Sequence, residues 1–161
     1  MNQKKLFNKN IIISAAADGI GRSIAEFCMN NGANVFVSDV NEDKLSLIKK
    51  HKNYNTTLFI KKVNANDPED VLNYFSELKN QITTIDGLIN NVGIAGPTGK
   101  IEELDVEQWK NTIDVNINSH FYFSKYSIPL LKKNGGSIIN LSSTAGLFGF
   151  PLRTPYAASK W

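Results

Sequence analysis

Short apolar runs alternate with segments of helical periodicity along the whole chain. Five β-branched runs are typical of strands buried on both faces of a parallel sheet, and they cover residues 10–14, 35–39, 58–63, 88–90 and 137–141. Helical spacing of apolar residues covers residues 22–31, 42–50, 68–82 and 106–131, and a further helix begins at Tyr156. We expect the long helix to be interrupted near Asn116. This alternation predicts an α/β fold, a doubly wound parallel sheet with helices on both faces.

Two helix ends carry recognisable signals. Gly32 follows residues 22–31 and is typical of a left-handed residue that ends a helix. Asp67 followed by Pro68 is typical of a helix start, with a side-chain cap and a proline in the first turn. Both signals agree with the helices that the apolar periodicity predicts.

Composition bounds the class of protein. The chain has 161 residues with 42% hydrophobic and 20% charged residues, which predicts a single globular domain over residues 1–161. The net charge of +3 is spread along the chain rather than gathered into a basic stripe, so we expect no nucleic-acid partner. No apolar run is long enough to cross a membrane or to form a signal peptide. Cys28 is the single cysteine, which excludes an intramolecular disulfide, and we expect a cytoplasmic protein.

The segment between the first strand and its helix has the composition of a phosphate-binding turn. Gly19 and Gly21 would let the backbone approach a pyrophosphate at the helix N-terminus. Asp39 ends the second strand, 20 residues beyond Gly19, where a carboxylate would bind the adenosine ribose of NAD. Its charge, together with that of Asp18, would repel the 2′-phosphate of NADP. A purely structural turn is the alternative interpretation.

Tyr156 and Lys160 are four residues apart and therefore share one face of a helix. Lowering a tyrosine pKa from about 10 to about 7 requires about 4 kcal/mol. One unit charge at about 4 Å and an effective dielectric of about 20 supplies roughly that energy. Lys160 could therefore make Tyr156 an acid/base near neutral pH, unless the two are only a surface pair. Ser143 could hold a substrate carbonyl oxygen, and Ser142 competes with it for that role.

Together these motifs resemble the short-chain dehydrogenase/reductase family, in its short rather than extended branch. The family's glycine-rich motif corresponds here to Ser14, Ala15, Gly19 and Gly21, and its strand-four motif to Asn90, Asn91, Val92 and Gly93. Its catalytic residues correspond to Asn116, Ser143, Tyr156 and Lys160. The last three show the family's separations of 13 and 4 residues, and Asn116 lies 40 residues before Tyr156.

The resemblance implies a Rossmann-like NAD-binding domain and a function. The function would be NAD-dependent transfer of hydride between the nicotinamide and an alcohol or carbonyl substrate. Tyr156 would exchange the proton, Lys160 would lower the tyrosine pKa and hold the nicotinamide ribose, Ser143 would orient the substrate oxygen, and Asn116 would anchor a water. No metal is implied, and a homo-oligomer, dimer or tetramer, is expected. The residues expected to contact the cofactor are Ser14, Ala15, Asp18, Gly19, Ile20, Gly21, Asp39, Val40, Asn64, Ala65, Asn90, Asn91, Gly93, Tyr156 and Lys160.

Three departures from the family pattern bear on this interpretation. Ala15 replaces a glycine, which is tolerable if that residue keeps a negative φ. Asn64 stands where the family often has an aspartate near the adenine, and its amide oxygen can still accept a hydrogen bond. The chain stops one residue after Lys160, which indicates an N-terminal fragment whose sheet is truncated after the fifth strand. We therefore expect residues 1–161 alone to be inactive.

Two functional alternatives and several residues remain open. A non-catalytic dinucleotide-binding regulatory module is the main alternative, although the intact Ser143, Tyr156 and Lys160 set favours an enzyme. An extended-branch epimerase or dehydratase would have a different glycine spacing. The aromatic residues Phe121, Tyr122, Phe123 and Tyr126 are expected to pack in the core. Either core packing or a substrate pocket fits Leu147, Phe148 and Phe150, and Arg153 could meet an acidic substrate or lie on the surface. Neither His51 nor His120 has partners at metal-ligand spacing.

Overall fold

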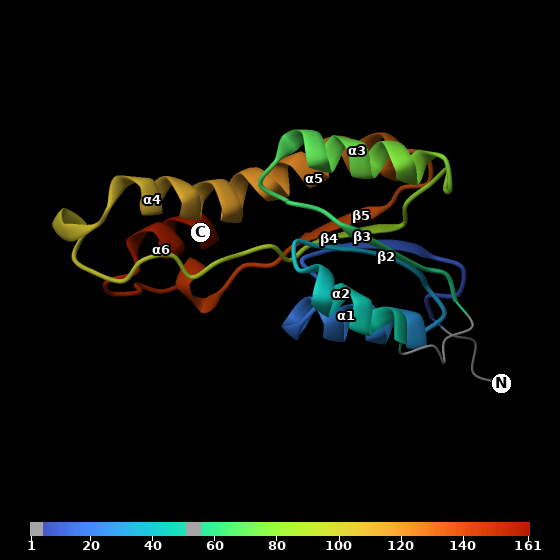
Figure 1. Cartoon of the computed structure of the whole chain (residues 1–161), viewed down its shortest axis with the longest axis horizontal. Coiled ribbons are helices and arrows are strands. Elements are labelled where there is room, and N and C mark those ends of the chain that lie inside the picture. The colour runs from blue at the N-terminus through green and yellow to red at the C-terminus, as the bar shows by residue number, and fades with distance from the viewer. Residues whose placement is uncertain (1–4, 51–55) are drawn as a thin grey trace.

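A five-stranded parallel sheet forms the centre of the molecule. The computed structural model describes residues 5–50 and 56–161 and places the strands in the order β3-β2-β1-β4-β5, with every neighbouring pair parallel (Figure 1). The strands are β1 (Asn10–Ser14), β2 (Asn34–Asp39), β3 (Leu58–Lys62), β4 (Gly87–Asn90) and β5 (Ser137–Asn140). The order reverses between β1 and β4, so a crevice is expected outside the carboxyl ends of these two strands.

Helices cover both faces of this sheet, as the alternating pattern predicts. In Figure 1, α1 (Gly19–Asn30) and α2 (Glu42–Lys50) lie on one face, and α3 (Pro68–Lys79) and α5 (Ser119–Leu131) lie on the other. Two helices, α4 (Val106–Ile113) and α6 (Thr154–Lys160), lie beyond the end of the sheet and pack against each other. Short 3₁₀ turns, η1 (Ile101–Glu103) and η3 (Thr144–Gly146), join these elements.

The predicted interruption of the long helix is a π-helical turn. It covers η2 (Asp114–Asn118), between α4 and α5. Other predicted ends are also present: Gly32 has a φ of +92°, and the Asp67 carboxylate accepts hydrogen bonds from the Glu69 and Asp70 amides. By contrast, α1 begins at Gly19 rather than at residue 22, because the Asp18 side chain accepts a hydrogen bond from the Gly19 amide and starts the helix earlier.

The core has two parts because successive side chains of a strand point to opposite faces. On the α1 and α2 face, Ile11, Ile13, Val35 and Val37 pack with Ala25 and Met29. On the α3 and α5 face, Ile12, Phe36 and Leu88 pack with Tyr74, Phe75 and Phe123. The expected core packing holds for Phe123 and, in part, for Tyr122 and Tyr126, but it is wrong for Phe121, which is 58% exposed on α5.

The outer side of β5 has no neighbouring strand in the described chain. Ile138 and Ile139 are accordingly exposed, in contrast to the buried side chains of β1, β2 and β4. The aromatic and aliphatic side chains of the loop before α6 are also exposed, among them Leu147, Phe148 and Phe150. Core packing of that loop is therefore wrong in this chain.

Candidate active site

The turn between β1 and α1 brings backbone groups close together. Gly19 has a φ of +54°, and Asp18 caps the helix that follows. A Cβ atom on Gly21 would lie 2.5 Å from both the Ala15 carbonyl oxygen and the Asn91 side-chain nitrogen. Only glycine leaves room for this approach, which brings the first turn of α1 against the end of β4. That turn has N–H groups without helical partners, as an anion site requires.

Ala15 departs from the expectation stated for it. Its φ is +50°, in the left-handed region, whereas the sequence interpretation required a negative φ. The turn imposes this conformation, because the Ala15 carbonyl oxygen accepts a hydrogen bond of 2.7 Å from the Asn91 side chain. The methyl group therefore occupies a position that favours glycine.

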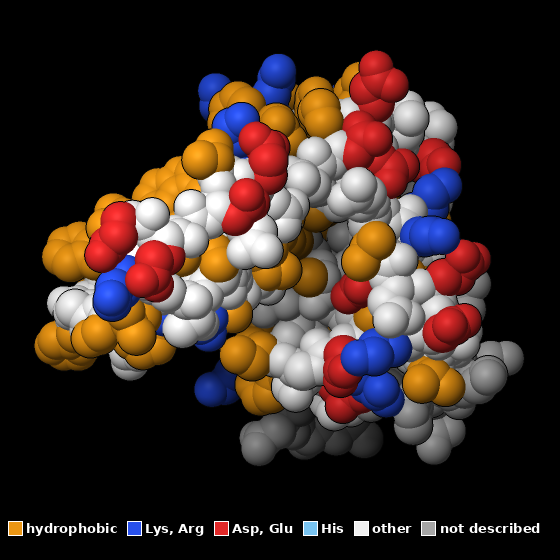
Figure 2. Space-filling model, turned by 60° about the vertical axis from the view of Figure 1, so that its left-hand side comes forward, with side chains coloured by type: hydrophobic (Ala, Val, Ile, Leu, Met, Phe, Trp, Pro, Cys, Tyr) orange, Lys and Arg blue, Asp and Glu red, His pale blue; other side chains and the backbone are white. Residues whose placement is uncertain are grey.

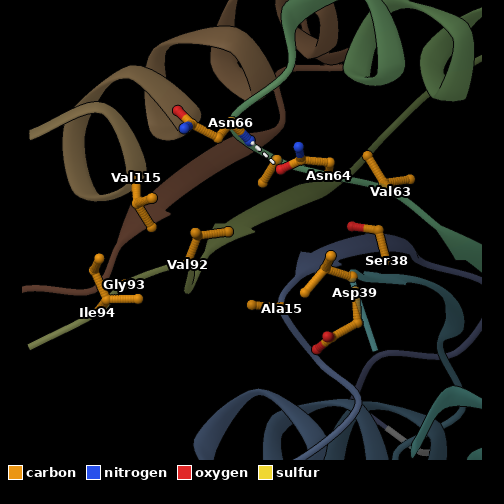
Figure 3. A pocket seen from close by; sticks show the side chains of 12 residues that line it. Ala15, Ser38, Asp39, Val63, Asn64, Asn66, Val92, Gly93, Ile94 and Val115 are labelled. Atoms are coloured by element: carbon orange, nitrogen blue, oxygen red, sulfur yellow. Dashed lines mark hydrogen bonds between the residues drawn. The ribbon is translucent and has the colours of Figure 1, made fainter. Parts of the chain in front are cut away.

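A cavity of about 270 Å³ opens beside the ends of β2 and β3, and we call it the Asp39 cavity (Figure 3). Its walls include Asp39, Val40, Asn64, Ala65 and Val115. The Asp39 carboxylate lies at the mouth of the β1–α1 turn, where it accepts hydrogen bonds from the Ala17 amide at 3.0 Å and the Asn41 amide at 2.9 Å. Six of the predicted cofactor residues thus line this cavity: Ala15, Asp39, Val40, Asn64, Ala65 and Gly93.

Asp18, near Asp39, has a cationic partner that the sequence analysis did not predict. Asp18 forms an ion pair with Lys44 at 2.5 Å, and this hydrogen bond holds the Asp18 pKa below its ordinary value. Because Asp18 is paired with a cation, we expect it to repel a 2′-phosphate less than the sequence alone predicts. Lys44 was not among the predicted site residues, because nothing in its local sequence indicates that α2 brings it to the β1–α1 turn.

A second cavity, of about 350 Å³, adjoins the first, and we call it the Tyr156 cavity. Ala15, Gly93 and Ile94 line both cavities. The other lining residues are Ile20, Asn91, Ala95, Leu141, Ser142, Tyr156 and Lys160. Figure 2 shows a hollow on this side of the molecule with hydrophobic side chains along its walls. Two adjoining cavities, one with a carboxylate and one with a tyrosine and a lysine, fit the two halves of an extended dinucleotide.

Tyr156 and Lys160 both lie on α6 and line the Tyr156 cavity, as their spacing predicts. The Lys160 ammonium donates a hydrogen bond of 3.0 Å to the Leu141 carbonyl oxygen at the end of β5. Burial lowers the pKa of Lys160 from its ordinary value. A Cβ atom on Gly93 would lie 3.1 Å from this ammonium, so the glycine leaves room for it.

Asn116 lies at the π-helical turn with its side chain buried under the cavity. Its side-chain oxygen accepts a 2.7 Å hydrogen bond from the Ile94 amide, and its nitrogen donates to the Ile94 carbonyl oxygen at 2.9 Å. The same nitrogen donates to the Ser159 hydroxyl at 2.8 Å, and Ser159 in turn donates to the Tyr156 carbonyl oxygen. Asn116 thus ties the wall at Ile94 to the helix of Tyr156. Ser159 was not predicted, and its position beside Lys160 is the only local signal for it.

The two serines after β5 have different surroundings. Ser142 lines the Tyr156 cavity, and its hydroxyl donates a hydrogen bond to the Lys160 carbonyl oxygen at 2.5 Å. The Ser143 hydroxyl accepts a hydrogen bond of 3.2 Å from the Ala145 amide and caps η3. The assignment of Ser143 as the substrate-orienting serine therefore remains a proposal.

Two predicted cofactor residues have interior side chains. Asn90 is completely buried, and its nitrogen donates to the Asn140 side chain at 2.8 Å and to the Ser124 hydroxyl at 3.1 Å. The Ser14 hydroxyl accepts a hydrogen bond from the Asn91 amide. Neither Ser14 nor Asn90 lines the Asp39 cavity or the Tyr156 cavity. Asn91 joins the β1–α1 turn to β4 and also lines the Tyr156 cavity.

The remaining candidates do not extend this site. Within residues 5–50 and 56–161, no group of three or more metal-ligating side chains comes together. His51 lies outside the described residues, and His120 on α5 donates from its ring to the Val92 carbonyl oxygen at 2.9 Å. None of the described helices is both long and apolar enough to cross a membrane.

The fold and the two cavities define the class of doubly wound nucleotide-binding proteins, and comparison with known proteins gives the family. A family model described as short chain dehydrogenase matches residues 9–161, so the chain belongs to the short-chain dehydrogenase family. It is 36% identical to a trans-4-hydroxycyclohexanecarboxylate dehydrogenase of Sinomonas cyclohexanicum, over 98% of this chain and 63% of that protein. The chain spans 55–63% of the length of the first curated relatives it matches.

Solved structures agree with the family. The E. coli oxidoreductase yciK superposes with a TM-score of 0.92 at 27% identity, covering 99% of this chain and 68% of that one. A short chain dehydrogenase from Shigella flexneri, complexed with NADP, also gives a TM-score of 0.92 at 27% identity, covering 99% and 69%. The Rossmann-like fold is therefore confirmed, and the family is one that binds nicotinamide cofactors.

Proposed function

We propose that the protein containing this chain is an NAD-dependent oxidoreductase that interconverts an alcohol and a carbonyl compound. The observation that carries this proposal is the adjoining pair of cavities, one lined by Asp39 and the other by Tyr156 and Lys160. A bound nicotinamide cofactor would accept or supply the hydride. The residues of this chain would bind that cofactor, orient the substrate oxygen and move one proton.

Each residue of the Tyr156 cavity has a role in this proposal. The Tyr156 hydroxyl gives a proton to the substrate oxygen in reduction and takes it back in oxidation. The Lys160 ammonium, which lines the same cavity as Tyr156, binds the nicotinamide ribose. Ser143 orients the substrate oxygen, and Asn116 anchors a water that leads protons away. At the other end, the Asp39 carboxylate accepts hydrogen bonds from the adenosine ribose hydroxyls, which favours NAD over NADP.

The substrate proposed is a cyclic secondary alcohol or the corresponding ketone. Two relatives support it by name, the trans-4-hydroxycyclohexanecarboxylate dehydrogenase and a cyclohexanol dehydrogenase of Acinetobacter sp. that is 35% identical. The exposed apolar side chains beside α6 fit such a substrate, since the Phe150 ring centre lies 6.3 Å from that of Tyr156.

We also propose that the protein is a cytoplasmic homo-oligomer, dimer or tetramer, in which the exposed Phe121 face of α5 becomes buried. Light scattering of the full-length protein tests this oligomeric state.

Changing Tyr156→Phe in the full-length protein tests the proposed function. Loss of the proton donor should lower kcat by at least about 10²-fold, while the Kd of NADH stays within about twofold. The matched control is Tyr126→Phe, which removes a hydroxyl from a residue that packs against the α3 and α5 core and lines neither cavity, and which should leave both quantities unchanged. If Tyr156→Phe keeps more than about a hundredth of kcat, the acid/base assignment is wrong. NADH binding without turnover on any cyclic alcohol or ketone would instead favour a regulatory module.

A further inference from the structure

Arg153 joins two segments that are far apart in the sequence. It directly precedes α6, and its Nη1 atom donates hydrogen bonds to the Gly96 carbonyl oxygen at 3.1 Å and to the Thr98 hydroxyl at 2.7 Å. Beside it, the Leu152 carbonyl oxygen accepts a hydrogen bond of 3.0 Å from the Gly99 amide. Among the described residues no carboxylate forms an ion pair with Arg153. Its guanidinium therefore binds the loop through one backbone carbonyl, of Gly96, and one side chain, of Thr98.

The segment that Arg153 holds is a wall of the Tyr156 cavity. Residues 94–99 form neither strand nor helix, and Ile94 and Ala95 line the cavity together with Tyr156. Asn116 already holds one end of this segment through both backbone groups of Ile94. The three hydrogen bonds to residues 152 and 153 hold the other end.

Two residues with left-handed backbone conformations constrain residues 94–99: Gly96 within the segment and Leu152, which contacts its end. Gly96 has a φ of +64°, and a Cβ atom there would lie 2.5 Å from the Thr112 hydroxyl of α4. Leu152, whose carbonyl oxygen accepts the hydrogen bond from the Gly99 amide, has a φ of +61°, a left-handed conformation that is strained for a bulky residue. Such a conformation persists only where surrounding contacts impose it. Here the contacts come from Gly99 and from the Arg153 side chain that follows.

We propose that Arg153 is a positioning residue, which fixes the 94–99 wall against the start of α6 and thereby sets the distance between the substrate oxygen and the Tyr156 hydroxyl. This inference rests on the proposed oxidoreductase function. Both hydrogen bonds leave from the Nη1 atom, and the planar, rigid guanidinium holds that atom in place better than the flexible side chain of a lysine would hold its ammonium. A displacement of about 1 Å at such a wall can cost about 10²-fold in rate.

The kinetic test uses Arg153→Gln and Thr98→Val in the full-length protein. Arg153→Gln should lower kcat about 10- to 100-fold, with the Kd of NADH within about twofold, because Asp39 and the β1–α1 turn are untouched. Thr98→Val removes one of the hydrogen bonds and should lower kcat about 3- to 10-fold. The double variant should be no worse than Arg153→Gln alone, since both substitutions remove the same contact.

Arg153→Lys should keep part of the activity that Arg153→Gln loses. Lys110→Gln, which breaks a surface pair with Glu107 on α4, is the control.

Substrate choice separates positioning from direct binding of an acidic substrate. Cyclohexanol and 4-hydroxycyclohexanecarboxylate should lose the same factor in kcat on Arg153→Gln. A loss confined to the carboxylate substrate, visible in KM, would overturn the inference and make Arg153 a substrate-binding residue.

Hydrogen exchange supplies a readout that does not depend on turnover. The Gly99 amide should exchange at least about tenfold faster in Arg153→Gln than in wild type, and at the wild-type rate in Lys110→Gln. A kcat within threefold of wild type, or unchanged exchange at Gly99, would overturn this inference while leaving the proposed function intact. Absence of turnover in the wild-type protein would overturn the proposed function, and this inference with it. If Arg153→Gln does not fold, the kcat and Gly99 exchange of Thr98→Val decide between the same outcomes.

Discussion

Ala15 combines a side chain with a left-handed backbone, which predicts a stabilising substitution. Its φ of +50° costs an L-residue roughly 1–2 kcal/mol, which glycine would not incur. Glycine also makes the unfolded chain more flexible, and this entropy reduces the gain by about 0.5–1 kcal/mol. Ala15→Gly should therefore raise the free energy of unfolding by about 0.5–1 kcal/mol in urea titrations. Ala25→Gly within α1 should lower it by at least about 1 kcal/mol, since that position is helical and its methyl group is buried. A loss of stability in Ala15→Gly would contradict the assigned strain.

Asp39 supplies the residue-scale test of cofactor choice. The full-length protein should bind NADH at least about tenfold more tightly than NADPH, which corresponds to about 1.4 kcal/mol. Asp39→Ala should remove most of this preference, as measured by fluorescence titration with both reduced cofactors.

Asp39→Asn is the matched control for that experiment, because its oxygen can still accept the hydrogen bond from the Ala17 amide. If the charge is responsible, Asp39→Asn should lose the preference as fully as Asp39→Ala does. Tighter binding of NADPH by the wild-type protein would show the assignment to be wrong, an outcome that the NADP complex of the Shigella flexneri relative makes worth testing.

At the scale of elements, the π-helical turn decides how α4 and α5 serve the site. A π turn inserts an extra residue into a helix and often occurs at functional positions. Here it lies at Asp114–Asn118 and places Asn116 under Ile94. The same turn begins α5 so that the ring of His120 reaches the Val92 carbonyl oxygen at the end of β4. One local irregularity thus joins two helices to the loop that follows β4.

The burial of His120 predicts how the stability of the protein depends on pH. Burial is the main cause that lowers the pKa of His120 below 6.5; the Lys160 charge adds to it and the Val92 hydrogen bond opposes it. Above about pH 6.5 both folded and unfolded states hold a neutral ring, so stability is full. As the pH falls below 6.5, the unfolded state takes up the proton first and stability is lost.

The melting temperature at pH 7.5 and pH 5.5 checks this sign. His120→Gln keeps a donor for the Val92 carbonyl oxygen but cannot titrate. Its melting temperature should fall less between these two pH values than that of the wild-type protein. An equal fall in both proteins would show that other groups cause the acid sensitivity.

At the scale of the whole molecule, the outer side of β5 predicts aggregation of the 161-residue polypeptide. Ile138 and Ile139 are 38% and 55% exposed on a strand whose outer hydrogen-bonding groups have no partner strand among the described residues. Exposed apolar edges of this kind pair with other chains. Ile139→Lys should therefore lower light scattering at 37 °C while the circular dichroism spectrum is kept.

Ile12→Lys is the control for a lysine that disrupts the fold: Ile12 is completely buried, so its replacement should unfold the chain and change the circular dichroism spectrum. Unchanged scattering in Ile139→Lys would mean that another surface drives association. The same preparation tests the expectation that residues 1–161 alone do not turn over substrate.

The sequence by itself determined the order of strands and helices along the chain and the parallel sheet. It also predicted Asp39, Tyr156 and Lys160, which line the two cavities. These features are encoded locally. A run of β-branched residues indicates a strand, and a tyrosine four residues before a lysine shares one face of a helix with it, so both signals can be read from neighbouring residues alone. The interruption of the long helix near Asn116 was also predicted, and the structure shows it as a π-helical turn.

Tertiary structure alone decided the conformations and contacts that depend on distant residues. Ala15 is left-handed because Asn91 holds its carbonyl oxygen, and Asn90 points inward because Asn140 and Ser124 accept its amide. The Arg153 guanidinium donates hydrogen bonds to the Gly96 carbonyl oxygen and the Thr98 hydroxyl, in a loop more than 50 residues earlier. Partners so far apart leave no periodicity or spacing in the sequence, because only the packing of β4, β5 and α6 brings them within hydrogen-bonding distance.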